Sequence, residues 1–247
     1  MQLIMGTHSC PAITREEDNS AVPNINWDQS YNAQGAVWGA EPSALAVFAC
    51  EYLNRFQPHS QLEILDLGCG YGRDALHLTK TLGCPVTGID SSTKAISMAL
   101  ESCPPELNNR VQFRCADFED ADKAYPVVFV SNLYQVLRDN ERTRLAQSIK
   151  KYLRPGGSLL LGTLSTHDTE EYRRGLPVAG EENSFEREKF LHFSIGAELE
   201  KEFAFLNIER LFEHEYLEPH AGARTHRHIS WILVATKPPN QPDKRGE

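Results

Sequence analysis

The chain has 247 residues, of which 40% are hydrophobic, so it can bury the core of one α/β domain. Its formal net charge of −9 gives no general positive field, which argues against nucleic acid or an anionic membrane surface as a partner. No segment approaches the roughly 20 apolar residues of a membrane span, and residues 1–10 lack the basic region of a signal peptide, so we expect a soluble, cytoplasmic protein.

The composition of the two ends sets the expected domain boundaries. Residues 1–23 and 237–247 are polar or rich in proline and charge, offer nothing to bury, and are predicted to be flexible. One domain is therefore expected over residues 24–236. The six cysteines include no CxxC pair, which favours reduced thiols without a disulfide framework.

Apolar periodicity predicts alternating helices and strands between these ends. Helices are predicted over 42–56, 91–100 and 195–205. A further helix follows a glycine turn and ends before Gly83, and another contains Leu145, Ile149 and Leu153 and ends at a Pro-Gly-Gly turn at 155–157. Strands are predicted over 63–67, 85–90, 111–117, 125–132, 158–164, 208–218 and 224–237, and the stretch before the last helix looks irregular. Continuous apolar strands such as VVFV indicate a parallel sheet covered on both faces. This pattern predicts an open, doubly wound sheet whose ligand lies beyond the carboxyl ends of its strands.

The stretch ILDLGCGYGRDALHL at 64–78 runs from an apolar strand through a glycine-rich turn into a helix. Gly68, Gly70 and Gly72 indicate a turn that can cradle a nucleotide-like ligand, and a tight turn without any ligand is the alternative. A dinucleotide fingerprint would need a third glycine where the chain has Arg73. That long cation disfavours a nicotinamide dehydrogenase but could pair with a carboxylate of the ligand.

Two carboxylates accompany the glycine turn. Asp66 lies two residues before Gly68 and is expected near an amino group of the ligand. Asp90 ends the predicted second strand, where it could accept hydrogen bonds from both hydroxyls of a ribose. Capping of the following helix is the alternative role for Asp90.

Five motifs in order carry a resemblance to a known family. They are ILDLGCGYG, GID at 88–90, CADF at 115–118, VSNLYQVL at 130–137 and LRPGGSLLL at 153–161. Together they resemble the class I S-adenosylmethionine (SAM)-dependent methyltransferases over about 100 residues. The resemblance implies a Rossmann-like, seven-stranded, mostly parallel sheet with a final antiparallel hairpin, and SAM as the cofactor.

The resemblance also implies site residues. Asp117 should bond the adenine amino group, and Phe118 should flank the ring, although core packing is the alternative for Phe118. Ser131 and Asn132 should line the cavity where the methyl group is transferred, with Asn132 as a catalytic candidate. The predicted cofactor-binding residues are Tyr31, Trp38, Asp66, Gly68, Gly70, Gly72, Arg73, Asp90, Ser91, Asp117, Phe118 and Ser131.

Two further segments are expected to build the acceptor pocket. Residues 26–43 place several aromatic residues before the first helix and resemble the aromatic lid of thiopurine and tellurite-resistance methyltransferases; a hydrophobic staple packed on the sheet is the alternative. The insertion at 164–194 is expected to cover the substrate, because long irregular segments in compact domains often do. The turn SNLY replaces the Asn/Asp-Pro-Pro-aromatic turn that is typical of methyltransferases acting on amide or nucleobase nitrogens, which favours a small-molecule acceptor.

The C-terminal strands are rich in histidine. His226 and His228 would share one face of a strand, beside a partner strand that carries His214, Tyr216 and Glu218. Three roles stay open for this hairpin: solvated polar groups, an acceptor pocket in which His226 and His228 act as catalytic bases, and a metal site, for which no compact zinc pattern appears.

The sequence therefore predicts a methyltransferase that uses SAM and a small-molecule acceptor, with a thiol or another chalcogen as the first choice. The alternative is a SAM-binding protein with non-methylating or metal-assisted chemistry at the histidine-rich hairpin. No nucleic-acid or membrane partner is expected, no metal is assigned, and the sequence does not indicate an oligomeric state.

Overall fold

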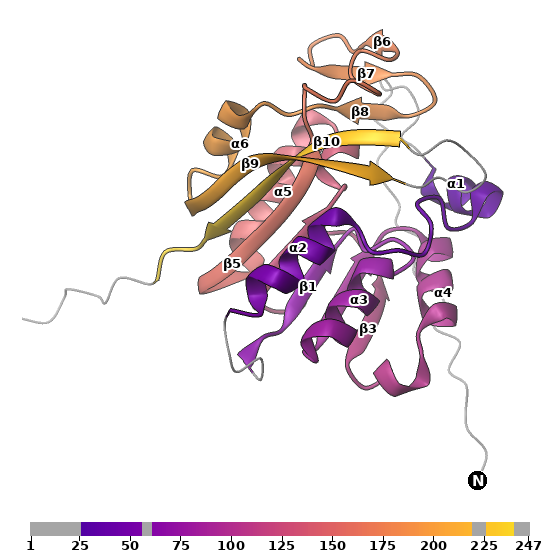
Figure 1. Cartoon of the computed structure of the whole chain (residues 1–247), viewed down its shortest axis with the longest axis vertical. Coiled ribbons are helices and arrows are strands. Elements are labelled where there is room, and N and C mark those ends of the chain that lie inside the picture. The colour runs from indigo at the N-terminus through magenta and orange to yellow at the C-terminus, as the bar shows by residue number, and fades with distance from the viewer. Residues whose placement is uncertain (1–25, 56–60, 219–225, 240–247) are drawn as a thin grey trace, which may run out of the picture.

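A computed structural model describes residues 26–55, 61–218 and 226–239 (Figure 1). Seven strands form one sheet in the order β3-β2-β1-β4-β5-β10-β9. The first five pair in parallel, whereas β10 runs antiparallel to both β5 and β9. The predicted fold class is therefore confirmed.

The elements alternate along the chain as the periodicity predicts. The sheet consists of β1 (Ile64–Leu67), β2 (Val86–Asp90), β3 (Val111–Cys115), β4 (Tyr125–Ser131), β5 (Leu153–Leu164), β9 (Asn207–Glu218) and β10 (His226–Thr236). The helices are α1 (Trp27–Gln34), α2 (Ala44–Leu53), α3 (Arg73–Leu82), α4 (Thr93–Ser102), α5 (Asp139–Tyr152) and α6 (Gly196–Glu202), with short 3-10 helices η2 (Pro105–Leu107) and η3 (Tyr134–Val136). None of the helices in these described parts has the length and apolar character of a membrane span.

Helices cover both faces of the sheet and bury two apolar layers. Leu53 of α2 and Leu78 of α3 pack with Leu160 of β5 on one face, and Leu145 of α5 packs with Leu161 on the other. Successive strand residues point to opposite faces, so the run LLL in β5 supplies both layers. This explains why the central strands are apolar at nearly every position rather than at alternate ones.

Local signals set the ends of the helices. The Ser92 side chain accepts a hydrogen bond from the Ala95 amide and caps α4. Gly83 adopts a left-handed conformation after α3, with a φ of 66°, which glycine adopts without a steric penalty. The end of α3 before Gly83 was predicted from the sequence.

Three features of the fold differ from the sequence prediction. The segment before α2 contains α1, a helix capped by Asn26 and followed by Gly35. The strand β5 starts directly after α5 at Leu153 and includes the Pro-Gly-Gly turn. The stretch predicted to be irregular contains a small antiparallel sheet of β6 (Leu176–Pro177), β7 (Ser184–Glu186) and β8 (Phe190–His192). Strands of two or three residues are too short to show a period in the sequence.

The cysteines agree with the prediction except at one position. Cys50, Cys69, Cys84 and Cys103 are free thiols. The prediction of reduced thiols is wrong for Cys115, which is disulfide-bonded, because a bond that follows no CxxC spacing cannot be read from a single sequence. The flexible ends predicted at 1–23 and 237–247 lie outside the described residues, apart from residues 237–239.

Candidate functional site

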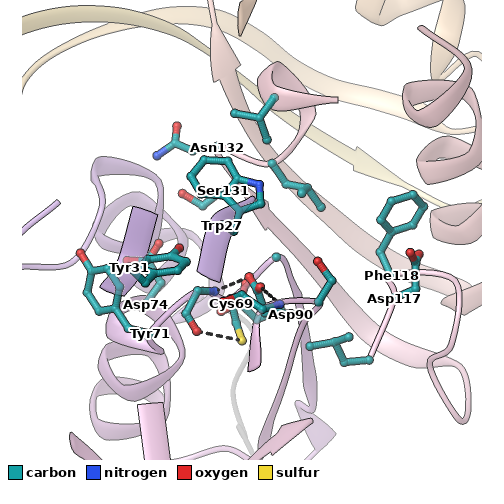
Figure 2. A pocket seen from close by; sticks show the side chains of 18 of the residues that line it. Trp27, Tyr31, Cys69, Tyr71, Asp74, Asp90, Asp117, Phe118, Ser131 and Asn132 are labelled. Carbon is teal, nitrogen blue, oxygen red and sulfur yellow. Dashed lines mark hydrogen bonds between the residues drawn. The ribbon is translucent and has the colours of Figure 1, made fainter. Parts of the chain in front are cut away.

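A cavity of about 480 Å³ opens at the carboxyl ends of β1, β2, β3 and β4 (Figure 2). The strand order reverses between β1 and β4, and such a reversal is where doubly wound sheets bind ligands. The volume of the cavity is typical of small-molecule sites. The lining includes every residue predicted to bind the cofactor except Gly72, and it also includes Asn132.

The glycine turn brings backbone close to the cavity. Gly68 and Gly70 adopt positive φ angles of 73° and 54°, a conformation that residues with a side chain rarely take. A Cβ atom added at Gly70 would lie 3.0 Å from the Tyr31 hydroxyl oxygen. Gly72 also has a positive φ, of 80°, and a Cβ atom there would lie 2.6 Å from the Phe113 ring. The backbone conformation therefore favours glycine at all three positions, and Gly70 and Gly72 also have no room for a side chain.

Asp90 holds the glycine turn from the end of β2. Its Oδ2 accepts a hydrogen bond from the Gly70 amide at 2.9 Å, and its Oδ1 accepts one from the Ser92 amide at 2.8 Å. Burial raises the pKa of Asp90, and these two hydrogen bonds oppose that rise. The cap of α4 is Ser92, so the alternative role of Asp90 as the helix cap is not observed. Each carboxylate oxygen keeps a further lone pair for a ligand.

Asp66 is a buried carboxylate without its full set of partners. It is 2% exposed, and its Oδ2 has no hydrogen-bond partner among the described residues. Burial raises the pKa of Asp66 well above its usual value, and the nearby carboxylates of Asp74 and Asp90 raise it further. Because an orphaned buried acceptor is costly, this oxygen indicates a ligand that brings a donor, such as an ammonium group.

Arg73 lines the cavity and bonds to the backbone of the segment between α1 and α2. Its Nη1 donates to the Trp38 carbonyl at 2.7 Å and to the Glu41 carbonyl at 3.2 Å, and its Nε lies 3.9 Å from Asp74 Oδ1. Arg73 therefore ties the segment between α1 and α2 to the first turn of α3. Asp74 also accepts from the Ser43 amide at 2.7 Å, which fixes the same segment from its other end.

Four aromatic rings form a cluster at one wall of the cavity. Trp27, Tyr31 and Trp38 lie with ring centroids 5.9 to 6.3 Å apart, and Tyr71 stacks on Trp38 at 6.4 Å. Tyr31 is 4% exposed, and burial raises the pKa of its hydroxyl. All four line the cavity, and the cluster packs on Ala95 and Met98 of α4. This wall supplies large, rigid apolar area next to the glycine turn.

Asp28 fixes α1 to α4. Its Oδ1 accepts from the Ser92 hydroxyl at 2.5 Å and from the Lys94 amide at 3.0 Å. A carboxylate at a helix N-terminus is stabilised by the amide groups and the helix dipole. The aromatic wall is thus held by a polar bond network on α4 as well as by Arg73.

The opposite wall comes from the loops after β3 and β4. Asp117 and Phe118 follow β3, and Phe118 is 9% exposed and also belongs to the apolar core. The Ser131 hydroxyl bonds to the Ser43 hydroxyl at 3.1 Å. Asn132 has a φ of 59°, and residues other than glycine in this conformation are uncommon and often lie at functional sites. Figure 2 shows Asp117 and Phe118 at the right and Ser131 and Asn132 near the top, away from Tyr31 and Tyr71 at the left.

The insertion 164–194 supports the site indirectly. None of its residues lines the cavity. The His192 imidazole bonds to Ser184 Oγ at 2.9 Å and to Glu198 Oε1 at 2.8 Å, and Glu198 also accepts from the Tyr134 hydroxyl at 3.0 Å. Tyr134 lies in η3, between cavity residues Leu133 and Val136. The insertion therefore holds a wall of the cavity, and its predicted role as a substrate cover stays a prediction.

The histidine-rich hairpin lies at the same edge of the sheet but outside the cavity lining. His228 is buried, and its Nδ1 lies 2.9 Å from Asp168 Oδ2. Its ring centroid lies 5.8 Å from that of Tyr216 and 6.0 Å from that of His226. The described residues include no group of three or more His, Cys, Asp or Glu side chains suited to a metal ion. The catalytic roles of His226 and His228 stay predictions.

Several cavity residues escaped the sequence prediction. They are Asp28, Tyr71, Asp74, Leu133 and Glu141, among others. Tyr71 and Asp74 lie inside the glycine motif itself, so the motif could have named them. Asp28 follows the cap Asn26 by two positions, and recognising α1 would have revealed it.

The central part of the chain is similar to known proteins. Residues 64–157 match the family described as methyltransferase domain. Over 101 residues, the chain is 33% identical to phosphoethanolamine N-methyltransferase 2 of Caenorhabditis elegans, a match that covers 40% of the chain and 23% of that relative. The chain thus spans less than a quarter of the length of this curated relative.

Solved structures share the fold over most of the chain. A protein solved in work on the conversion of a disulfide bond into a thioacetal group during echinomycin biosynthesis has a TM-score of 0.65 at 21% identity, covering 87% of this chain and 93% of its own. TehB from Haemophilus influenzae has a TM-score of 0.59 at 18% identity, covering 85% and 65% of the two chains. The predicted resemblance to class I SAM-dependent methyltransferases is confirmed over residues 64–157, and the matches support SAM as the cofactor.

Proposed function

We propose that the protein is a methyltransferase that transfers the methyl group of SAM to a small-molecule acceptor. The observation that supports this most is that the residues of the family motifs converge on one cavity. Asp66, Asp90 and Asp117 come from three successive strand ends and line the same space. The match over residues 64–157 includes all three.

The polar groups of the cavity fit the proposed cofactor. The orphaned Asp66 oxygen would accept a hydrogen bond from the ammonium group of SAM. Asp90 has lone pairs left for the ribose hydroxyls after its two backbone bonds. Asp117 and Phe118 would hold the adenine, one by its amino group and the other by its ring face.

The bound cofactor supplies a methyl group that its positive sulfonium has already activated. The residues of the chain would then bind, orient and exclude water. Alignment of the reactants alone can supply about 7–11 kcal/mol of the barrier. Arg73 and the aromatic wall would close the cavity, and Ser131 and Asn132 would orient the acceptor beside the methyl group.

His226 and His228 are retained as candidate bases in this proposal. Asp168 orients the His228 ring through Nδ1, which favours a basic Nε2 in the neutral imidazole. Because neither histidine lines the cavity, a proton transfer to them would need an acceptor that extends toward the hairpin.

The acceptor atom is the finer part of the proposal. The sequence predicts a thiol or another chalcogen, because residues 26–43 resemble the aromatic lid of the thiopurine and tellurite-resistance methyltransferases. The C. elegans relative is named for methylation of nitrogen in phosphoethanolamine, which supports an amine. The fold is common to methyl transfer to sulfur and to nitrogen, so the charge of the cavity has to distinguish a chalcogen acceptor from an amine.

A methyl-transfer assay tests the proposal. Radiolabelled SAM would be incubated with thiol, selenite, tellurite, amine and carboxylate acceptors, and both the labelled product and S-adenosylhomocysteine would be measured. We expect turnover with at least one acceptor. Tight binding of SAM without turnover of any acceptor would favour the alternative, a SAM-binding protein with non-methylating chemistry.

A further inference from the structure

The cavity has a strongly negative lining. Six carboxylates belong to its described residues: Asp28, Asp66, Asp74, Asp90, Asp117 and Glu141. One guanidinium, that of Arg73, opposes them there, and it already bonds to two backbone carbonyls. The whole chain carries a formal net charge of −9. The walls therefore favour a cation and repel an anion.

The carboxylates also act on one another in the protein alone. Burial raises the pKa of Asp66, and the carboxylates of Asp74 and Asp90 raise it further. Burial also raises the pKa of Asp90, to which Asp28 adds a smaller part. A ligand with a negative charge would add to this repulsion. One with a positive charge would relieve it.

The aromatic wall is suited to the same kind of ligand. Trp27, Tyr31 and Trp38 line the same cavity as Asp28 and Asp90, and aromatic faces attract alkylammonium groups. No lysine or arginine in the described part of the chain stacks on these three rings. Tyr31 is 4% exposed and lines the cavity.

We infer that the acceptor is an amine that enters the cavity as a cation, and that oxyanions such as selenite and tellurite are excluded. This inference rests on the proposed function and narrows its acceptor. Trp27 and Asp28 would recognise the ammonium group, one through the ring face and the other through charge.

The chemistry of transfer agrees with the charge of the walls. The ammonium first loses a proton to water, and its nitrogen lone pair then forms the new C–N bond as the S–CH₃ bond breaks. The positive charge moves from sulfur to nitrogen, so the cavity keeps a cation throughout. A thiol would have to react as its thiolate, whose negative charge the carboxylates oppose.

Binding of matched probes tests the inference without turnover. The full chain would first be titrated with S-adenosylhomocysteine by calorimetry, and the complex would then be titrated with choline and with 3,3-dimethyl-1-butanol, its uncharged isostere. We expect choline to bind about tenfold more tightly than the alcohol, and selenite to give no binding.

Variants separate the two recognition elements. Trp27→Leu should weaken choline binding about fivefold and leave the affinity for S-adenosylhomocysteine within about twofold. Asp28→Asn should also weaken choline binding, because it keeps an oxygen that can accept from Ser92 and Lys94 but removes the charge. Trp231→Phe is the matched control, since Trp231 lies in β10 outside the cavity lining and should change neither affinity.

The outcomes distinguish the inference from the proposed function. If the chain binds S-adenosylhomocysteine but its complex binds choline and the alcohol equally, the amine inference alone is overturned. Binding of selenite to that complex would have the same meaning. A chain that binds neither S-adenosylhomocysteine nor choline would contradict the proposed function and this inference with it.

Discussion

The amide of Gly70 donates a hydrogen bond to Oδ2 of Asp90 at 2.9 Å, which links the glycine turn after β1 to the end of β2. This bond sets the positions of the turn and of a carboxylate that faces the cavity. One residue therefore shapes the site and offers acceptors to a ligand. Loss of Asp90 should affect both.

Asp90→Ala should weaken SAM binding at least about tenfold, because hydrogen bonds to a charged acceptor contribute about 1.5–3 kcal/mol each. Asp90→Asn should give a smaller loss, since its oxygen can still accept one bond. Titration calorimetry with S-adenosylhomocysteine measures both effects. Glu101→Gln, an exposed change on α4, is the control, and an unchanged affinity in Asp90→Ala would remove this residue from the site.

Asp66 should make the ligand-free protein less stable as the pH rises. Its folded pKa is raised above the usual value of 3.8, so the folded state holds its proton at pH values where the unfolded chain has lost it. Stability then falls as the pH rises from 3.8 toward the folded pKa. Urea unfolding across this range should show that slope in the wild type, and Asp66→Asn should reduce it.

The same substitution should have the opposite effect on the cofactor. An ammonium group beside Asp66 favours the ionised carboxylate, so Asp66→Asn should weaken SAM binding. The same variant should stabilise the ligand-free fold at pH values above 3.8, where wild-type stability falls. A variant that gains stability and keeps full affinity would show that no cation of the ligand lies beside Asp66.

Arg73 should control how long a ligand stays in the cavity. Arg73→Met removes the bonds to the Trp38 and Glu41 carbonyls and should speed the dissociation of S-adenosylhomocysteine by about three- to tenfold, because closing segments retain ligands. Stopped-flow fluorescence of the tryptophans near the cavity can follow it. Arg55→Met, at the end of α2, serves as the control, and equal dissociation rates for the two variants would exclude the tether.

Asp168 should contribute to the stability of the folded protein. It is fully buried and accepts from His228, Ile229, Glu170 and Glu171. Burial alone would raise the pKa of Asp168, but these bonds outweigh it and lower the pKa. Its stabilisation is therefore present above the unfolded pKa and is lost as the pH falls through the folded one. Asp168→Ala should cost about 3–5 kcal/mol in the free energy of unfolding, measured with urea.

His228→Gln tests the predicted base separately from stability. If His228 acts on the acceptor, kcat/KM for the acceptor should fall at least about tenfold while the affinity for S-adenosylhomocysteine stays constant. His214→Gln, on the neighbouring strand, is the control. Equal loss of affinity and turnover in His228→Gln would assign the residue a structural role.

The grouping of the glycine turn with its carboxylates was predictable because the information for it is local. Gly68, Gly70 and Asp66 lie within five residues of one another in a strand-turn-helix pattern, and Asp90 ends the next strand. In a parallel sheet the ends of successive strands meet at one edge. The sequence therefore predicted these neighbours without knowledge of the fold.

The surroundings of the cavity and of the histidine-rich hairpin were harder to predict because they depend on contacts between distant segments. The bond between Asp168 and His228 spans 60 residues, and the bond between Asp28 and Ser92 spans 64. Arg73 was predicted to face the ligand, but the backbone carbonyls it binds cannot be recognised in a sequence. Such contacts follow from tertiary packing, which overrides local patterns.

Titration calorimetry with S-adenosylhomocysteine and with NAD tests the central claim most directly. The account predicts that S-adenosylhomocysteine binds the wild-type chain at a single site, that Asp90→Ala weakens this binding at least about tenfold, and that NAD gives no heat. Binding of NAD without any binding of S-adenosylhomocysteine would contradict the account.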